Sequence, residues 1–196
     1  TVKEGKTITQ QIHLIREEVH RSDRIITDLM GFAQLAEGSV EPLNIPEEMD
    51  QAVEQVFPEA ADFKMKIERD YAPALPKVFM QRGHFNEIMV NILQNAREAI
   101  PENCKIKLTA SAGEDYSILV TIEDSGPGMS QELLDQVFEP YFTTKEKGTG
   151  LGLAIVRHNV EIYGGHLKVE SQLGEGTKFI LQFPARTLIK LQRNPG

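Results

Sequence analysis

The chain has 196 residues, of which 40% are hydrophobic and 26% charged, as is typical of a soluble globular protein with room for one large domain. Its formal net charge of −8 argues against nucleic-acid binding, which needs a basic surface. A single cysteine excludes an internal disulfide, and no apolar run has the roughly 18 residues of a membrane span. The chain begins at Thr1 without a signal-peptide pattern, so we expect a piece of a longer protein or a processed product.

A long amphipathic helix is the first predicted element. Apolar side chains recur alternately four and three residues apart, with one polar interruption, as in the a/d seam of a helical bundle: Ile8, Ile12, Ile15, Val19, Ser22, Ile26, Leu29 and Ala33. The pattern ends at Gly38 and Pro42. Because this segment has no neighbour of its own to cover the stripe, we expect a partner helix from another chain or from an upstream segment. The alternative is a helix that lies on its own globular domain.

The remaining residues predict one domain of mixed helices and strands. We expect helices at 46–57, 82–100, 133–137 and 151–162, and strands at 63–69, 105–110, 116–123, 166–171 and 177–184. Turn glycines at Gly113 and Gly174 predict that the last four strands form two antiparallel hairpins. This combination favours an α+β fold, namely a two-layer α/β sandwich. Residues 186–196 are expected to form a C-terminal tail.

The helix at 82–100 carries two amides on an otherwise apolar face. Asn91 and Asn95 are four residues apart and therefore lie one above the other on the same face. Buried amides are costly unless they are hydrogen-bonded, and an amide oxygen is a hard ligand suited to Mg²⁺ that keeps its waters and phosphate oxygens. The pair predicts a metal and phosphate site, whereas either residue alone would be an ordinary surface asparagine.

A carboxylate and two glycines follow the strand at 116–123. Asp124 stands at the strand end in "EDSGPGMS", where it could accept a hydrogen bond from an exocyclic amine. Gly128 would let a ring approach the backbone closely. The alternative is an ordinary Asp-Ser-Gly turn.

Three glycines at alternate positions, Gly148, Gly150 and Gly152, precede the last predicted helix. The spacing in "GTGLGL" is neither the dinucleotide fingerprint nor a Walker A loop. Glycines let backbone N–H groups point into one concavity, and the N-terminus of the following helix adds partial positive charge. The segment therefore suits phosphate, with a flexible turn as the alternative.

With "FEPYFTTK", these motifs resemble, in content and order, the ATP-binding domain of the GHKL superfamily and, within it, the sensor histidine kinases of two-component systems. "NILQNA" resembles the N box, "DSGPGM" the G1 box, "FEPYFTTK" the F box and "GTGLGLAI" the G2 box. "REEVHRSDRIITDLMGFAQL" is similar to the second helix of a dimerisation and phosphoacceptor hairpin, and the resemblance covers residues 10–184. The short segment between Thr143 and Gly148 resembles the short-lid group related to nitrogen-regulation kinases.

The resemblance implies roles for individual residues. Asn91 and Asn95 would be catalytic, and Asn95 would be the ligand of a Mg²⁺ ion that bridges the phosphates of ATP. Asp124 would read the adenine amino group, with Thr177 supporting it through water. The other implied ATP contacts are Gly126 and Gly128 around the adenine, Phe138 and Phe142 at the base of a lid, Lys145 at a phosphate oxygen, and Gly148, Thr149, Gly150, Leu151 and Gly152 around the phosphates.

The resemblance also implies the domain organisation and the reaction. Residues 1–40 would be the second helix of the dimerisation bundle, whose first helix is absent from this chain. Residues 41–185 would be the ATP-binding catalytic domain, and residues 186–196 would be a tail. The parent protein would form a homodimer, phosphorylate a protein histidine and pass the phosphoryl group to an aspartate of a response regulator. We expect a bacterial cytoplasmic location, in a parent with or without a membrane anchor.

The segment with the acceptor histidine and its neighbouring acid has no match in the chain, since His13 and His20 lie on the second-helix pattern. We therefore expect the chain to bind Mg·ATP without phosphorylating itself; stable radiolabelled phosphate on the isolated chain would contradict this.

Two other functions remain as alternatives. A GHKL ATPase of the gyrase-B or mismatch-repair type usually has Glu, the base for water, where Asn91 stands, and an amide cannot deprotonate water. A nucleotide-sensing pseudokinase module would dimerise and signal without chemistry. A His-acid pair upstream of Thr1 would favour the kinase over the module.

Overall fold

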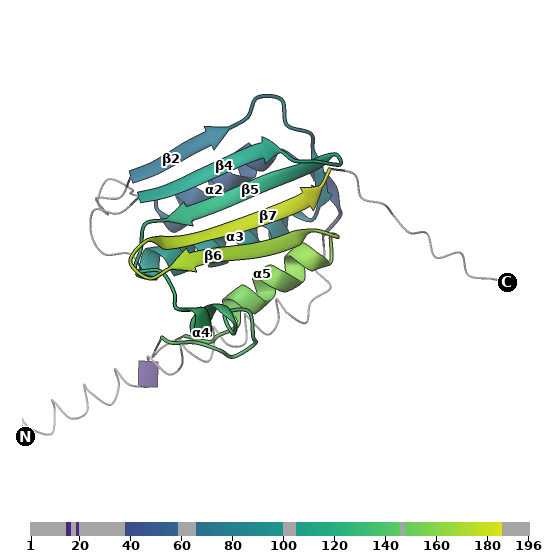
Figure 1. The fold of residues 1–196 in the computed structure, drawn as a ribbon. Helices are drawn as coiled ribbons and strands as arrows, with labels where there is room; N and C mark the ends of the chain where they lie inside the picture. Colours follow the sequence, from purple (N-terminus) through teal and green to yellow (C-terminus); the bar gives the residue numbers. More distant parts are fainter. Residues whose placement is uncertain are drawn as a thin grey trace, which may run out of the picture.

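A computed structural model of the protein describes residues 15, 16, 19, 38–58, 66–99, 105–145 and 148–185. The main sheet contains, in spatial order, β2 (Lys66–Tyr71), β4 (Lys105–Ala112), β5 (Ser117–Asp124), β7 (Gly176–Pro184) and β6 (His166–Gln172). Helices α2 (Ile45–Val56), α3 (Arg82–Ala99) and α5 (Gly152–Glu161) cover one face of this sheet (Figure 1). The predicted two-layer α/β sandwich is thereby confirmed.

The core lies between the sheet and these helices because both layers have one apolar face. On β4 and β5, a buried apolar side chain recurs at every second position and so lies on one face of the sheet: Ile106, Leu108, Ala110, Ile118, Val120 and Ile122. On α3 the buried side chains recur with helical spacing: His84, Phe85, Ile88, Met89, Ile92, Leu93 and Ala96. The apolar stripe of α3 thus faces the sheet, and its polar residues are left for the helix edge.

Both predicted hairpins are present, since β4 pairs antiparallel with β5 and β6 pairs antiparallel with β7. No pairing was predicted for the first strand of this sheet, β2, which pairs in parallel with β4. A parallel pair needs a long crossover connection, and the segment between the two strands, which contains α3, provides it.

Two short strands were not predicted. β1 (Glu41–Leu43) and β3 (Val78–Met80) pair antiparallel as a separate sheet beside the main one. Three residues are too few to show alternation, so only the tertiary pairing reveals them. The short helix expected at 133–137 is α4 (Gln131–Leu134) instead, one turn that starts directly after Ser130. The other described helix and strand boundaries lie within two residues of the predicted ones, and positions 63–65 and 100 are outside the described residues.

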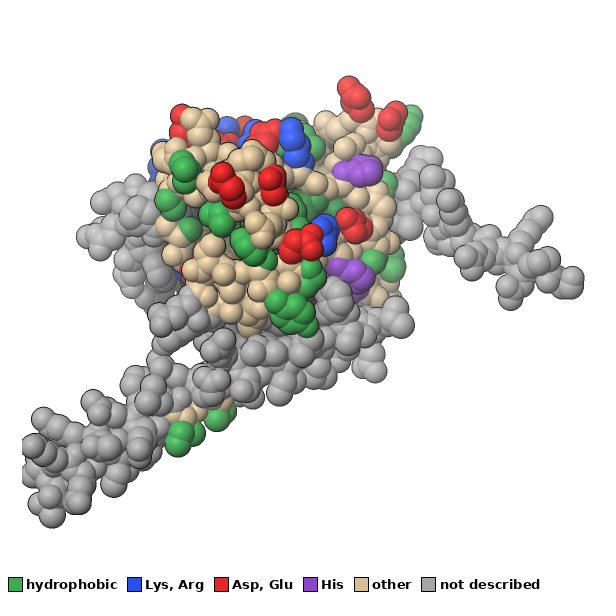
Figure 2. Space-filling view, turned by 60° about the horizontal axis from the view of Figure 1, so that its bottom comes forward, with side chains coloured by type: hydrophobic (Ala, Val, Ile, Leu, Met, Phe, Trp, Pro, Cys, Tyr) green, Lys and Arg blue, Asp and Glu red, His purple; other side chains and the backbone are tan. Residues whose placement is uncertain are grey.

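The predicted bundle helix and C-terminal tail lie almost wholly outside the described residues. Of the seam, Ile15 and Val19 are described; both are helical, and 63% and 53% of their surface is exposed. Among the helices that the structure describes, none has the length and apolarity to span a membrane. On the face seen in Figure 2, carboxylate groups are spread out and basic side chains do not gather into a patch.

Candidate functional site

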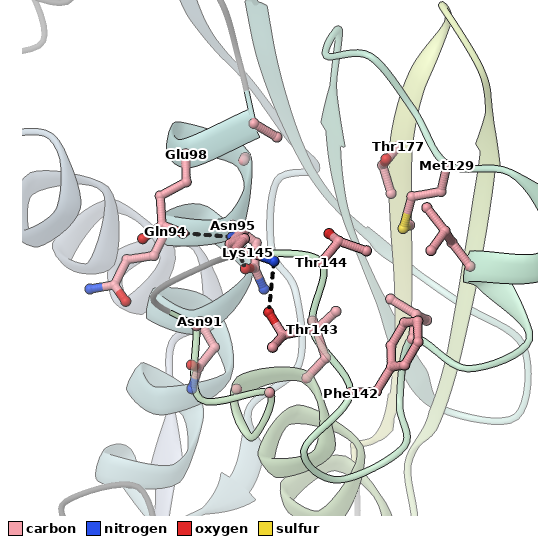
Figure 3. Close-up of a pocket in the computed structure, with 18 of the residues that line it drawn as sticks. Asn91, Gln94, Asn95, Glu98, Met129, Phe142, Thr143, Thr144, Lys145 and Thr177 are labelled. Carbon is pink, nitrogen blue, oxygen red and sulfur yellow. Dashed lines mark hydrogen bonds and ion pairs between the residues drawn. The ribbon is translucent and has the colours of Figure 1, made fainter. Parts of the chain in front are cut away.

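A cavity of about 500 Å³ opens between α3, the loop after β5 and the segment that leads into α5. Its wall contains eleven of the predicted site residues: Asn91, Asn95, Asp124, Gly128, Phe142, Lys145, Gly148, Thr149, Gly150, Gly152 and Thr177. Figure 3 shows amide and carboxylate side chains projecting from α3 on one side, with Met129 and Thr177 on the other. Motifs from distant parts of the chain thus meet in one cavity, of a size that suits a small molecule.

The oxygens of the two asparagines face the segment before α5. The amide nitrogen of Asn91 donates to the backbone oxygen of Glu87 at 2.9 Å, which leaves its Oδ1 atom directed at the start of α5. A Cβ atom on Gly152 would lie 2.6 Å from this oxygen, so a larger residue there would displace the Asn91 side chain. Oδ1 of Asn95 accepts a hydrogen bond from the ammonium group of Lys145 at 2.8 Å.

Lys145 also forms an ion pair with Glu98, whose Oε2 atom lies 2.6 Å from the ammonium nitrogen. The carboxylate of Glu98 and the amide of Asn95 thus form a pair of oxygens that binds a positive charge at the cavity wall. Glu98 and Gln94, which also lines the cavity, were missed in the sequence analysis. The signal was available, because each lies three residues after a predicted asparagine and hence on the same helix face.

Asp124 provides a buried acceptor on the other side of the cavity. Its surface is 8% exposed, and Oδ1 accepts a hydrogen bond from the backbone N–H of Gly126 at 2.8 Å. Burial raises the pKa of Asp124, and backbone hydrogen bonds from Gly126 and Thr177 oppose this rise without cancelling it. The strand register places Thr177 directly opposite Asp124. A carboxylate and a hydroxyl group therefore lie together in the wall.

The segment before α5 is held by a close backbone contact. Gly150 has a φ angle of +70°, and its carbonyl oxygen accepts a hydrogen bond from the backbone N–H of Tyr141 at 2.9 Å. A Cβ atom at position 150 would collide with the backbone of Tyr141. Both the backbone conformation and the lack of space require glycine here. Tyr141 itself has a φ angle of +67° and a side chain that is largely exposed.

Three predicted site residues are not in the cavity wall. Gly126 supports Asp124 through the hydrogen bond described above, Phe138 packs against the hydrophobic core, and Leu151 is buried directly before α5. The apolar part of the wall was not predicted: Ala96, Ala99, Met129, Leu133, Val137, Leu153 and Phe179. Most of these side chains have the same spacing as core residues. Pro127, Met129, Thr143 and Thr144 lie inside the quoted motifs "DSGPGM" and "FEPYFTTK", but no role was assigned to them.

Comparisons with known proteins identify the family of this chain. A family model described as "Histidine kinase-, DNA gyrase B-, and HSP90-like ATPase" matches residues 80–187. Sporulation kinase E of Bacillus subtilis is 29% identical over 182 residues, which are 93% of this chain and 25% of that protein. The chain therefore spans about a quarter of the length of this relative.

Two solved structures have a similar fold. Full-length ShkA in complex with AMPPNP has a TM-score of 0.76 and 28% identity, over 89% of this chain and 38% of the other. Histidine kinase ThkA in complex with response regulator protein TrrA has a TM-score of 0.75 and 25% identity, over 92% of this chain and 52% of the other. With more than half of its residues matched by the family model, the chain belongs to the histidine kinase-, DNA gyrase B- and HSP90-like ATPase family, the GHKL superfamily.

Proposed function

We propose that this chain is the ATP-binding catalytic part of a sensor histidine kinase. The observation that carries the proposal is the cavity itself, whose wall contains Asn91 and Asn95, Asp124 and Thr177, and the glycine-rich segment before α5. In Figure 3 the two asparagines lie on the side of the cavity opposite Thr177. The kinases named above, which match most of this chain, support the same function.

The base would bind at the Asp124 side of the cavity. The carboxylate accepts hydrogen bonds and would bind the amino group of adenine, with Thr177 supporting it through water. Gly126 and Gly128 shape the loop around Asp124, and apolar side chains such as that of Met129 offer surface for a ring. A buried acceptor that fits an amino group discriminates strongly against bases that lack one.

The triphosphate would lie between α3 and the start of α5. Backbone N–H groups near the N-terminus of α5 and the ammonium of Lys145 would face phosphate oxygens. The residues proposed for this part are Asn91, Lys145, Gly148, Thr149, Gly150, Leu151 and Gly152, and Phe138 and Phe142 would anchor the base of the lid. The assignment to the short-lid group of kinases remains a prediction.

A magnesium ion fits the oxygen that we assign to it. Oδ1 of Asn95 accepts a hydrogen bond from the positively charged ammonium group of Lys145, and the carboxylate of Glu98 forms an ion pair with the same ammonium group. An amide oxygen beside phosphate oxygens and water is a suitable ligand set for Mg²⁺. When bound, the ion would neutralise charge on the phosphates, and Asn95 would hold it.

The reaction would be transfer of the γ-phosphoryl group to a histidine nitrogen. A bond forms between this nitrogen and the γ-phosphorus, the bond to the bridging oxygen breaks, and ADP leaves. The residues of this chain would position the phosphates and balance their charge, which is the main contribution of enzymes to phosphoryl transfer. Asn91 provides an amide where a hydrolase needs a base for water, which favours transfer over hydrolysis.

The partners of this proposal are a helical bundle that carries the histidine and the receiver domain of a response regulator. ThkA was solved with such a regulator. Homodimerisation through the predicted seam belongs to the same proposal and is supported by the spacing of the apolar residues and by the exposure of Ile15 and Val19. A bacterial cytoplasmic location is part of it as well.

Calorimetric titration with ATP and Mg²⁺ tests this function. We expect the chain to bind Mg·ATP and Asn95→Ala to lose about 1–3 kcal/mol of binding free energy, since a buried polar contact is removed. Asn86→Ala removes an amide from the same helix away from the cavity wall and should bind like the wild type. Equal affinities of all three proteins would overturn the assignment, and steady ATP turnover would favour a hydrolase.

A further inference from the structure

Ser171 lies behind the wall of the cavity and contacts the residues that we assign to the base. We propose that Ser171 is a positioning residue that orients the hydroxyl of Thr177 as an acceptor toward the cavity, and so favours purines with an amino group at C6. The inference rests on the proposed function, in which Asp124 and Thr177 face the base.

Ser171 connects three parts of the structure through one hydroxyl group. It lies on β6, opposite Thr177 on β7, and is not part of the cavity wall. Its Oγ atom accepts a hydrogen bond from the backbone N–H of Met129 at 2.8 Å and donates one to the backbone oxygen of Gly176 at 2.7 Å. Oγ1 of Thr177 lies 3.0 Å away.

Counting protons fixes the direction of the last of these contacts. A serine hydroxyl has one proton and two lone pairs. The carbonyl oxygen of Gly176 can only accept, so it takes the proton of Ser171, and the N–H of Met129 uses one lone pair. The contact with Thr177 therefore uses the second lone pair, and Thr177 is the donor. Its proton points away from the cavity toward Ser171, which leaves its lone pairs for the cavity.

This orientation makes the wall around the base a set of acceptors. Thr177 and Asp124 both line the cavity, and they lie opposite each other in the strand register. The 6-amino group of adenine donates hydrogen bonds to such a wall, directly or through water. A 6-oxo purine presents an acceptor at C6 and carries its proton on N1 instead, so at the C6 position acceptors face each other without a proton between them. Without Ser171 the Thr177 hydroxyl can turn and donate toward the 6-oxo group.

The test compares ATP with inosine triphosphate, in which a 6-oxo group replaces the 6-amino group, by calorimetry on the full 196-residue chain with Mg²⁺. In Ser171→Ala we expect the ratio of the dissociation constants, ITP over ATP, to fall about three- to ten-fold, the equivalent of one hydrogen bond. Asp124 is unchanged, so a preference for ATP should persist.

Ser117→Ala is the matched control. Ser117 lies in the same sheet, donates to the backbone oxygen of Glu114 at 2.6 Å and accepts from the side chain of Gln182 at 2.9 Å, but it is not in the cavity wall. Its loss affects the stability of the sheet and should leave the ratio unchanged. In a Thr177→Val background, Ser171→Ala should also leave the ratio unchanged, because the group that it orients has been removed.

The outcomes separate this inference from the function on which it rests. Three results would overturn the role of Ser171. The ratio of dissociation constants could stay unchanged in Ser171→Ala, or it could change equally in Ser117→Ala. It could also still change on Ser171→Ala when the Thr177 hydroxyl is absent. A wild-type chain that binds both nucleotides equally would overturn the assignment of the base site instead. If Ser171→Ala does not fold, Ser171→Cys keeps the volume with a weakly hydrogen-bonding thiol, and the same ratio decides.

Discussion

The ammonium nitrogen of Lys145 lies 2.8 Å from Oδ1 of Asn95, the oxygen that we assign to Mg²⁺. The same nitrogen is 2.6 Å from a carboxylate oxygen of Glu98. A divalent ion bound to Asn95 and the Lys145 ammonium group would therefore both need the same Oδ1 atom, and their positive charges would repel each other. Under this assignment, Lys145 would compete with the metal at Asn95 and would contact phosphate once it has moved.

This competition predicts opposite effects for two neighbouring charges. In Lys145→Met, we expect the Mg²⁺ concentration that gives half-maximal ATP binding to fall about two- to five-fold, since a competing cation is removed. In Glu98→Gln it should rise, because a carboxylate that attracts the ion is lost. Titration of Mg²⁺ at fixed ATP measures both values, and a shift in the same direction for both variants would contradict the competition.

The raised pKa of Asp124 predicts a pH dependence of binding. The folded chain holds this proton more tightly than the unfolded chain, so the contribution of Asp124 to stability is present below its unfolded pKa and is lost as the pH rises through the folded pKa. Binding of an amino group needs the ionised carboxylate. We therefore expect ATP affinity to rise with pH as Asp124 loses its proton, above the usual range of an aspartate.

Asp124→Asn is the control for this pH profile. The variant should bind ATP at least about ten-fold more weakly at neutral pH, since a charge-assisted hydrogen bond is lost. Titration of the ATP phosphates affects both proteins equally, so the difference between the two profiles reports on Asp124. Parallel profiles from about pH 4 to pH 8 would show that another group titrates.

The contact between Gly150 and Tyr141 predicts that alanine at position 150 disrupts nucleotide binding. Gly150 and Gly164 have almost the same φ angle, +70° and +69°, so alanine costs about 1–2 kcal/mol of backbone strain at either position. At Gly150 the added Cβ also collides with the backbone of Tyr141, whereas at Gly164 nothing lies within 4 Å.

We therefore expect Gly150→Ala to lower ATP affinity by about ten-fold or more and Gly164→Ala to leave it unchanged, with similar effects of strain on the free energy of unfolding. Calorimetry and chemical denaturation measure the two quantities. Loss of binding in Gly164→Ala as well would indicate a global effect of strain.

A buried ion pair predicts a larger stability effect than an exposed one. Glu48 is 6% exposed and hydrogen-bonded to Arg82, which also contacts Glu41 on β1 at 3.1 Å. Arg82→Ala leaves the Glu48 carboxylate buried without this partner, and we expect the free energy of unfolding to fall, by an amount that the half-exposed position of Arg82 limits.

The matched comparison is Lys168→Ala, which breaks an exposed pair with Glu170 at 2.6 Å and should lower the free energy of unfolding less than Arg82→Ala does. Denaturant unfolding measures both variants, and adding Glu48→Gln to Arg82→Ala should restore part of the loss. Equal losses in the two single variants would show that burial of Glu48 has no consequence.

Local spacing was sufficient to predict much of the site. Asn91 and Asn95 are four residues apart on a strongly periodic helix, so their common face follows from helix geometry alone. Asp124 ends an alternating strand, and the three glycines stand directly before a helix. Each signal depends on neighbours within one element, and all of these residues lie in the wall of the same cavity.

The sequence by itself determined the layer architecture and the polar groups of the site, because periodicity and turn residues act over a few positions. Tertiary structure alone decided the parallel pairing of β2, the ion pair of Lys145 with Glu98 and the contact of Ser171 with Met129. Lys145 and Glu98 are 47 residues apart, and Ser171 and Met129 are 42 apart. Contacts over such separations depend on how the packed core places whole elements, and no local pattern encodes that placement.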